Sequence, residues 1–101
     1  MNWDTSKTDD LMGAILRLRS KAEAKRFFRD LLTEDELIEF GNRWLAACLL
    51  ARGVSYTKIV DRTRLSSRTI ARVSKWLNSG EDGYKLMIGR LNHDHNSSPA
   101  G

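Results

Sequence analysis

The chain has 101 residues, of which 41% are apolar and 30% charged, and this balance fits one globular domain and excludes an intrinsically disordered chain. No apolar run approaches the ~18 residues of a membrane-spanning helix, and the polar start MNWDTSKTDD is unlike a signal peptide, so we expect a soluble cytoplasmic protein. The net charge is only +4, from 17 Lys and Arg against 13 Asp and Glu, so a strongly charged surface has to be local.

The first predicted helix follows a polar N-terminus. Residues 1–7 are polar apart from Trp3 and are expected to be loose. From Thr8 onward, apolar residues recur at helical spacing. The stripe consists of Leu11, Ile15 and Leu18, widened by Met12 and Leu16.

Two capping boxes predict where the next two helices begin. Ser20 is followed three residues later by Glu23, and Thr33 is followed in the same way by Glu36. In a capping box the hydroxyl oxygen accepts a hydrogen bond from the N–H of the later residue, and the Glu carboxylate accepts one from the N–H of the cap. The second helix is apolar on one side, through Ala24, Phe27, Phe28, Leu31 and Leu32.

The third predicted helix is the longest and runs to about Arg52, with Gly53 as its stop. Apolar residues cover well over half of its circumference, which is more than a surface helix needs. They include Leu37, Ile38, Phe40, Trp44, Leu45, Cys48, Leu49 and Ala51. We therefore expect a central helix that is packed on several sides.

The segment 55–77, SYTKIVDRTRLSSRTIARVSKWL, is predicted to form a helix-turn-helix. Leu65 stands in the turn, and Ser66 fits the N-cap of the second helix. At about 100° per residue, one side of that helix carries Ile70, Val73 and Leu77. The opposite side carries Ser67, Arg68, Ala71, Arg72 and Lys75. A short, polar, cationic side is what a helix requires to approach base edges in the major groove.

The charge of this segment distinguishes it from the rest of the chain. Six basic residues stand against the single acid Asp61, which gives +5, and the remainder sums to 11 basic minus 12 acidic residues, or −1. A basic motif of this kind is typical of a DNA-binding surface, because affinity for duplex DNA arises largely from counterion release at the phosphates. The alternative of a merely solvated charged face stays open at this point.

The C-terminal part is predicted to contain a loop, a helix and a tail. The loop has the sequence NSGEDG, and the helix carries Tyr84, Met87, Ile88 and Leu91 at spacings of three and four. Residues 92–101 are polar and are expected to be disordered. The predicted organisation is a loose N-terminus 1–7, a helical DNA-binding domain 8–91 and a disordered tail 92–101, in an all-α fold.

Six helices with wide apolar faces exceed what a chain of 101 residues can bury alone. A homodimer would cover the first, second and last of them. A two-fold pair of recognition helices would also contact two half-sites about one helical turn apart. We therefore expect an obligate homodimer.

Three segments together resemble a known family. They are RFFRDLLTEDEL, EFGNRWLAACLLARGVSYTKIVDRTRLSSRTIARVSKWLNSG and GYKLMIGRL. In order and spacing they resemble the Trp repressor superfamily, and most nearly its Trp-repressor-like YerC/YecD family, over about residues 14–91. The resemblance implies a six-helix, intertwined homodimer and a transcriptional regulator, expected to be a repressor, that binds operator DNA.

The resemblance also implies where DNA is contacted. The base-reading positions of the family match Ser67, Arg68, Thr69 and Ala71. Arg68 would contact a guanine edge, or a phosphate if it lies too far along the helix. The phosphate contacts are assigned to the basic residues of the segment, Lys58, Arg62, Arg64, Arg72 and Lys75.

An effector pocket is implied as well, in which the family holds an indole between two arginines. These positions match Arg43 and Arg72, and a ligand-contacting threonine matches Thr33. Val73 and Trp76 stand where the Trp repressor has a glycine and a serine, so their larger side chains would partly fill the pocket. We therefore expect that tryptophan is not bound, while another effector stays open. Contacts to phosphates or salt bridges within a dimer are the alternative roles for the two arginines.

Arg64 stands in the turn where a glycine in the left-handed conformation is usual. A residue other than glycine costs on the order of 1 kcal/mol in that conformation. Two interpretations follow, namely a different turn geometry, or a long basic side chain kept for a phosphate contact.

Other chemistries have little support in the sequence. Cys48, the single cysteine, has no His or basic neighbour at helical spacing and is expected in the core. His93 and His95 stand in a polar tail without further ligands, so we expect no metal and no cofactor. We also find no nucleophile constellation and expect no enzyme. Two alternatives to a regulator remain, a protein interaction module whose helix-turn-helix no longer binds DNA, and a replication-related DNA-binding protein.

Overall fold

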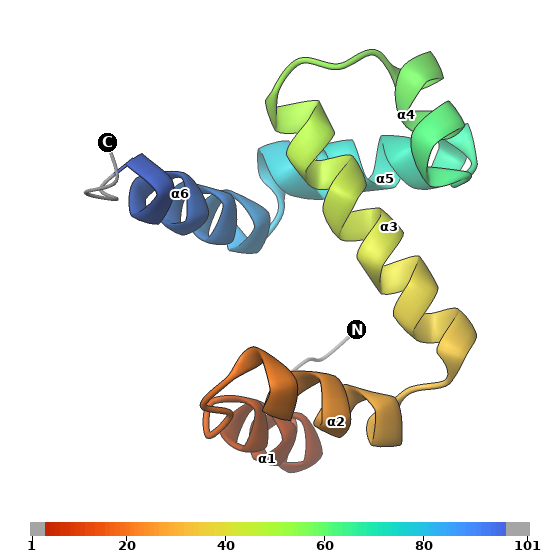
Figure 1. The fold of residues 1–101 in the computed structure, drawn as a ribbon. Helices are drawn as coiled ribbons and strands as arrows, with labels where there is room; N and C mark the ends of the chain where they lie inside the picture. The colour runs from red at the N-terminus through yellow and green to blue at the C-terminus, as the bar shows by residue number, and fades with distance from the viewer. Residues whose placement is uncertain (1–3, 97–101) are drawn as a thin grey trace. The chain divides into compact units, whose positions relative to one another are not determined.

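The computed structural model describes residues 4–96, with side chains as far as Asn92. Its helices, drawn in Figure 1, are α1 (Ser6–Ile15), α2 (Lys21–Leu31), α3 (Glu34–Ala51), α4 (Tyr56–Thr63), α5 (Ser67–Ser79) and α6 (Gly83–Asn96). The described residues form six helices and no strand, so the all-α prediction is confirmed. The chain divides into two compact units, Met1–Leu37 and Ile38–Gly101. Trp3 and residues 97–101 lie outside the described part.

α1 begins and ends earlier than the sequence predicts. Thr5 is its N-cap, because the Thr5 Oγ1 accepts a hydrogen bond from the Thr8 N–H at 3.2 Å. The helix therefore begins two residues before the predicted start, which corrects the prediction of a loose stretch 1–7 at its last two residues. At the other end, the N–H groups of Arg17 and Leu18 donate to carbonyl groups only three residues back. This tightening ends the helix, so Leu18 lies outside it.

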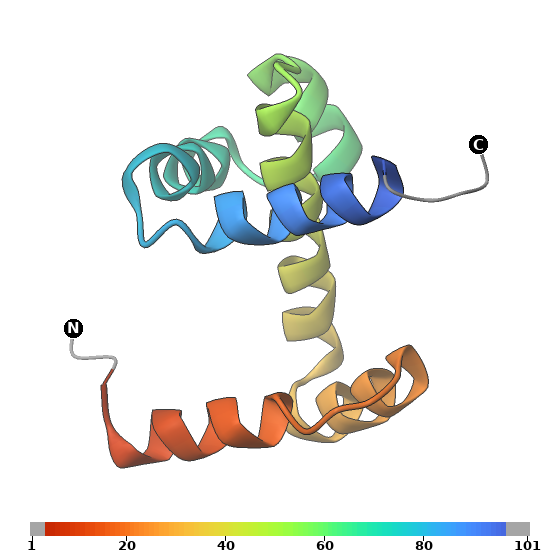
Figure 2. The ribbon, with the colours of Figure 1, turned by 90° about the vertical axis from the view of Figure 1, so that its left-hand side faces the viewer.

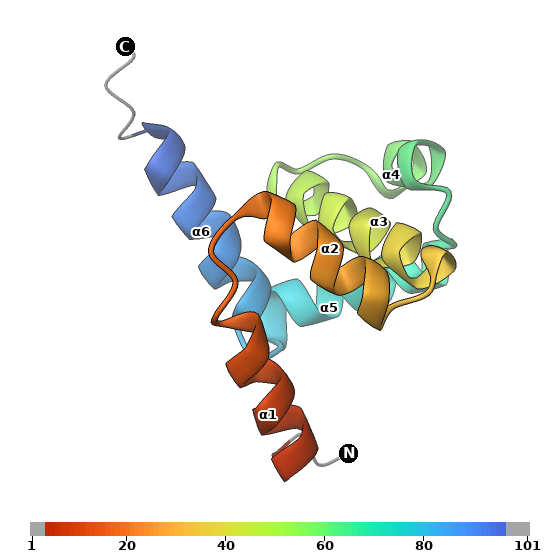
Figure 3. The ribbon, with the colours of Figure 1, turned by 60° about the horizontal axis from the view of Figure 1, so that its bottom comes forward.

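α2 follows α1 after a short turn (Figure 3). The predicted cap is confirmed, since the Ser20 Oγ accepts from the Glu23 N–H at 3.1 Å. The Glu23 carboxylate accepts from the N–H of Arg19 at 2.9 Å, one residue before the cap, rather than from the cap itself. The rings of Phe27 and Phe28 lie edge to face with centroids 5.4 Å apart. Neither α1 nor α2 contains a buried residue.

The capping box at the start of α3 is confirmed in both directions. The Thr33 N–H donates to the Glu36 Oε1 at 2.9 Å, and the Glu36 N–H donates to the Thr33 Oγ1 at 3.1 Å. The hydrogen bond from the Thr33 backbone lowers the pKa of Glu36 below its ordinary value of 4.5, and the hydrogen bond with the Thr33 side chain lowers it further. Both contacts favour the charged form of the carboxylate.

The C-terminus of α3 is a Schellman motif. Gly53 has a φ of +81°, as predicted for a helix stop. Its N–H donates to the carbonyl of Leu50 at 3.0 Å, and the Val54 N–H donates to the carbonyl of Leu49 at 3.0 Å. These bonds satisfy carbonyl groups that the end of a helix leaves without partners, and they turn the chain toward α4.

The core lies in the second unit, between α3, α4 and α5. Its buried residues are Ala46, Ala47, Leu49, Ile59, Leu65, Ile70 and Val73. α6 lies against this core (Figure 2). It packs through Tyr84 and Ile88, and Tyr84 stacks on Trp44 of α3 with 6.3 Å between ring centroids. The prediction that α3 is central therefore holds for its C-terminal half. In its N-terminal half, Ile38 and Phe40 are 55% and 48% exposed.

α6 is longer than the sequence predicts. It ends at Asn96, whereas the predicted helix ends at Leu91. No proline or glycine stands in the sequence from residue 92 to residue 96, so nothing there interrupts the helical hydrogen bonds. The prediction of disorder from residue 92 is corrected to that extent.

Glu36→Gln is expected to change the pH dependence of stability. Because the folded pKa of Glu36 is lowered, its contribution to stability is present above the unfolded value of about 4.5 and is lost as pH falls through the folded pKa. Glutamine keeps the capping geometry without the charge. The urea midpoint of the wild type should exceed that of the variant at pH 7, and the difference should vanish near pH 2. The same difference in Glu34→Gln, which changes the first turn of α3 outside the capping box, would contradict this account.

Candidate nucleic-acid interface

α4 and α5 form the predicted helix-turn-helix, and each begins at a serine cap. The Ser55 Oγ accepts from the Lys58 N–H at 3.4 Å, and the Ser66 Oγ accepts from the Thr69 N–H at 3.1 Å. The predicted cap of the recognition helix at Ser66 is therefore confirmed. The two caps determine where each helix starts on either side of the turn.

The turn between α4 and α5 is held by Arg64 and Thr63. Arg64 has φ 63° and ψ 7°, so it occupies the left-handed conformation, and its N–H donates to the carbonyl of Val60 at 2.8 Å. The buried Thr63 hydroxyl donates to the carbonyl of Ile59 at 2.7 Å and accepts from the N–H of Leu65 at 3.2 Å. Leu65 is only 8% exposed and fills the turn from the core side, as predicted.

The left-handed backbone of Arg64 excludes one of the two interpretations of this residue. A different turn geometry is wrong, because the backbone takes the conformation in which glycine is usual. Its side chain is exposed, so a phosphate contact stays a prediction. Thr63 was missed by the sequence analysis, although a threonine before the turn is a signal for a side chain that bonds the local backbone.

α5 has two opposite faces. Ile70 and Val73 are fully buried and Leu77 is 7% exposed, so the predicted apolar side faces the core. The opposite side is exposed and consists of Ser67, Arg68, Ala71, Arg72 and Lys75. The helix therefore presents a polar, cationic face to solvent while its other face holds it in place.

The four predicted base-reading residues lie in the first turns of α5. Ser67, Arg68 and Ala71 are exposed. Thr69 is half-buried, and its Oγ1 accepts a hydrogen bond from the Ser66 Oγ at 3.0 Å. One lone pair of the Thr69 hydroxyl is thus occupied by the cap, and its remaining bonding capacity and methyl group stay available.

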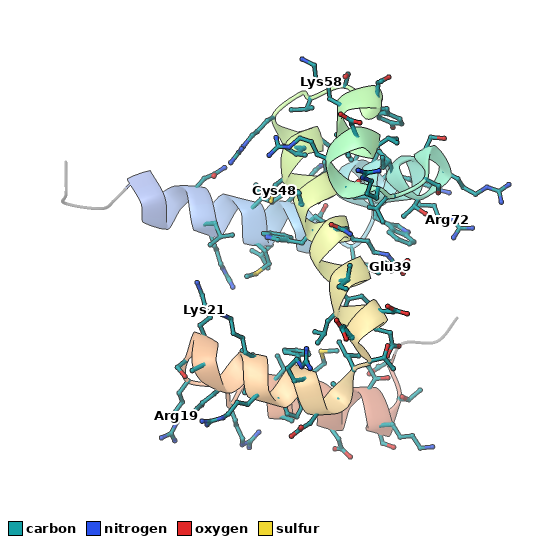
Figure 4. All side chains as sticks on the ribbon, turned by 45° about the vertical axis from the view of Figure 1, so that its right-hand side comes forward. Arg19, Lys21, Glu39, Cys48, Lys58 and Arg72 are labelled. Carbon is teal, nitrogen blue, oxygen red and sulfur yellow. The ribbon has the colours of Figure 1, made fainter. Side chains whose placement is uncertain are left out.

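The predicted phosphate-contacting residues all lie on exposed positions of the helix-turn-helix. They are Lys58 and Arg62 of α4, Arg64 of the turn, and Arg72 and Lys75 of α5. Figure 4 shows the side chains of Lys58 and Arg72 extending from these helices. With Arg68 they carry six positive charges, and Asp61 reduces the charge of the segment to +5. No ion pair with a described carboxylate neutralises any of the six.

The predicted effector residues have different surroundings. Val73 belongs to the buried core cluster, Arg72 is exposed, and Trp76 is 46% exposed. Thr33 is part of the capping box of α3. Val73 therefore serves the core, and the role of this set in binding an effector stays a prediction.

Arg43 is held by neighbours on its own helix. Its Nη2 lies 2.6 Å from the Glu39 Oε2, and its guanidinium carbon lies 6.0 Å from the centroid of the Phe40 ring. Its Nε is buried without a hydrogen-bond partner among the described residues. The sequence analysis missed the Glu39–Arg43 pair, although an acid four residues before a base on a helix is its usual signal.

A cavity of about 140 Å³ lies between α3 and α6. It is lined by Cys48, Ala51, Arg52, Ile88, Leu91 and Asn92. Burial raises the pKa of the Cys48 thiol, while the charge of Arg52, a basic neighbour four residues on that the sequence analysis overlooked, opposes this shift. The thiol is thus kept protonated, which is the opposite of what a reactive cysteine needs.

In the part of the chain that the structure describes, no three His, Cys, Asp or Glu side chains are placed so that they could hold a metal ion together. The side chains of His93 and His95 lie outside that part. Within the same part, no helix combines the length and the apolar character that crossing a bilayer demands.

Comparison with known proteins relates this arrangement to a family. A family model described as Trp repressor protein matches residues 6–92. The chain is 37% identical over 90 residues to the uncharacterised protein YerC of Bacillus subtilis, covering 89% of this chain and 86% of that protein. It also matches the crystal structure of a TrpR-like protein from Eubacterium eligens with a TM-score of 0.85 and 36% identity, over 89% of this chain and 93% of that one. These similarities confirm the expected Trp-repressor-like fold.

Replacing Arg64 by glycine tests whether its left-handed backbone conformation is strained. Glycine relieves a left-handed strain of about 1 kcal/mol but loses more entropy on folding, so Arg64→Gly should leave the free energy of unfolding unchanged or raise it by up to about 1 kcal/mol. The control Arg62→Gly lies inside α4 and should lower it by up to about 1 kcal/mol. Urea unfolding measures both. Equal losses in the two variants would show that Arg64 carries no strain.

Proposed function

This chain belongs to the Trp repressor protein family, and we propose that it is a sequence-specific DNA-binding transcriptional regulator that acts as a homodimer through α4 and α5. The observation that carries the proposal is the division of α5 into a buried apolar face and an exposed cationic face. A helix held from behind by Ile70 and Val73 can enter a major groove without losing its own support.

The exposed residues support separate roles in base contacts and in phosphate contacts. Arg68, one position into α5, carries the fork of donors that matches the acceptors of a guanine edge. Ser67, Thr69 and Ala71 are short enough to let the helix backbone approach the bases. The phosphate contacts fall to Lys58, Arg62, Arg64, Arg72 and Lys75, which position the helix and supply most of the affinity.

The N-terminal helices support the proposal of a homodimer. α1 and α2 have 10 and 11 residues and contain no buried residue. Helices of this length are marginal in water unless an apolar face is packed. Leu16 is 83% exposed, and Met12 and Leu31 are exposed by nearly half. These helices therefore need a partner.

The same requirement holds in the second unit. Ile38 and Phe40 on α3 are exposed, and so are Leu86, Met87 and Leu91 on α6. A second copy of the chain offers matching apolar faces, because a two-fold interface joins the same surface of both subunits. The resulting pair of α5 helices would contact an inverted repeat, which suits an operator.

We further propose that tryptophan is not the effector. Val73 is part of the core, and Trp76 places an indole one helical turn after Arg72 on α5. The guanidinium of Arg43 is engaged by Glu39 at 2.6 Å, which competes with a ligand carboxylate. A dimer bound to an operator without a ligand would act as a repressor in the cytoplasm, by excluding other proteins from that site. No role as an enzyme is proposed.

Selection from random duplex DNA tests the proposed function. Without added ligand, we expect an enriched inverted repeat with half-sites about 10 bp apart. Added tryptophan should change neither the selected sequence nor the affinity. Uniform weak binding without enrichment would overturn ligand-independent recognition, in favour of a regulator that needs another effector or of an interaction module. An operator enriched only with tryptophan would overturn the ligand-independent part alone.

Arg68→Ala tests the assignment of base contacts. If Arg68 contacts a guanine, the variant should lose about 1–3 kcal/mol on the selected operator and tolerate other bases at one position of each half-site. Arg90→Ala, which removes an exposed arginine from α6, is the matched control and should keep both affinity and preference. Equal weakening of Arg68→Ala on all sequences would show a phosphate contact instead.

A further inference from the structure

The chain contains a second basic segment besides the helix-turn-helix, which its small net charge does not reveal. Residues 17–29 contain six basic residues and one acid, Glu23, which gives +5. The helix-turn-helix segment 55–77 also carries +5, and the rest of the chain has 5 basic and 11 acidic residues, or −6. The charge of −1 outside residues 55–77 is therefore the sum of one strongly basic segment and several acidic ones.

α2 displays most of this charge on one side. At about 100° per residue, Lys25 and Arg29 lie about 40° and 80° around the helix from Lys21, and Arg26 follows at about 140°. We call Lys21, Lys25, Arg26 and Arg29 the α2 basic stripe. Ala24, Phe27, Phe28 and Leu31 lie between about 240° and 340°, on the other side. The stripe is thus separate from the apolar face of the same helix.

The stripe is free to meet a partner. All four of its side chains are exposed. No ion pair joins them to a carboxylate among residues 4–92, whose side chains the structure describes and where the ion pair observed is that of Arg43 with Glu39. Arg19 adds a positive charge in the turn before α2. Its side chain and that of Lys21 extend in different directions (Figure 4). A concentration of unpaired positive charge is costly by self-repulsion unless an anion approaches it.

We propose that the α2 basic stripe is a second contact surface for the phosphates of duplex DNA, separate from the helix-turn-helix. The inference rests on the proposed function and deepens it. From Lys21 to Arg29 the stripe is about 12 Å long at 1.5 Å per residue. One DNA strand presents a phosphate every 3.4 Å along the axis, so three or four phosphates lie within that length. Phosphate contacts carry no sequence information, so this surface would add affinity for any sequence.

Duplex DNA fits the stripe better than an anionic membrane does. A helix that lies on a membrane carries Lys and Arg on its polar face and buries its aromatic and aliphatic side chains in the bilayer. On α2, Asp30 and Glu23 occupy about 180° and 200°, one border of the apolar face, where they would meet anionic headgroups. Phe27 and Phe28 are half-buried and packed edge to face, so they are not free to insert into a bilayer.

The salt dependence of DNA affinity tests this surface. The variant Lys21→Gln, Lys25→Gln, Arg29→Gln removes three charges, and glutamine keeps the helix. Each phosphate that the variant no longer neutralises should make the slope of log affinity against log salt shallower by about 0.9. A homodimer carries the stripe twice, so we expect a change of about two to three per subunit and up to about five for the dimer on the selected operator, with sequence preference unchanged. Circular dichroism confirms that the variant is folded. Lys21→Arg with Lys25→Arg keeps the charge and should retain the wild-type slope.

The matched control removes the same residue types elsewhere. Lys7→Gln, Lys85→Gln, Arg90→Gln also replaces two lysines and one arginine outside the stripe, and its slope should stay that of the wild type. Equal changes in both triple variants would reduce the effect to net charge and overturn the inference. A wild-type slope in the α2 variant on an operator that the wild type binds specifically would overturn the inference and leave the proposed function intact. Absence of any salt-dependent duplex binding by the wild type would overturn both.

A membrane is distinguished in the same series. Vesicles of phosphatidylcholine with and without phosphatidylserine are mixed with the wild type and the α2 variant. We expect no binding that depends on the stripe. Binding to the anionic vesicles that the α2 variant loses, with an unchanged DNA slope, would assign the stripe to lipid headgroups and overturn the inference.

Discussion

The left-handed backbone at Arg64 is the constraint on which the presentation of α5 depends. It lets the chain reverse within a few residues, so that Leu65 enters the core directly before the Ser66 cap begins the next helix. The buried Thr63 hydroxyl supports this conformation by bonding the backbone on both sides of the turn. The backbone strain at Arg64 is thus offset by the packing of Leu65 and by the two hydrogen bonds of the Thr63 hydroxyl. The exposed face of α5 owes its rigidity to these buried contacts.

Electrostatics in this chain are arranged by segment rather than by overall charge. Two segments of +5 are separated by acidic ones, including Glu34, Asp35 and Glu36 in the first turn of α3. The acids stabilise the start of that helix through its macrodipole and, for Glu36, through the capping box. The same residues that stabilise local structure therefore keep the two basic surfaces apart along the chain. A modest net charge is compatible with strong local attraction for an anionic partner.

Features that depend on residues three or four apart could be predicted from the sequence. The caps at Ser20, Thr33 and Ser66 and the buried face of α5 belong to this class, because helical geometry alone brings the partners together. The end of α1 could not be predicted, since apolar spacing continues to Leu18 after the hydrogen bonds have shifted to a tighter pattern. Spacing also does not show what covers an apolar face, which is why Ile38 looked central and is exposed. The contacts of Arg68 with bases depend on a partner molecule and stay a prediction.

The lack of buried residues in α1 and α2 bears on how such a regulator would respond to its own abundance. If a second copy completes these helices, as proposed, their folding becomes a bimolecular process that mass action favours at high chain concentration. The amount of binding-competent dimer would then rise with roughly the square of the chain concentration while monomers predominate. Occupancy of a target site would change steeply over a narrow range of expression. A small change in synthesis or turnover of the chain would thereby produce a larger change in the occupancy of the target site, without any cooperativity between separate sites.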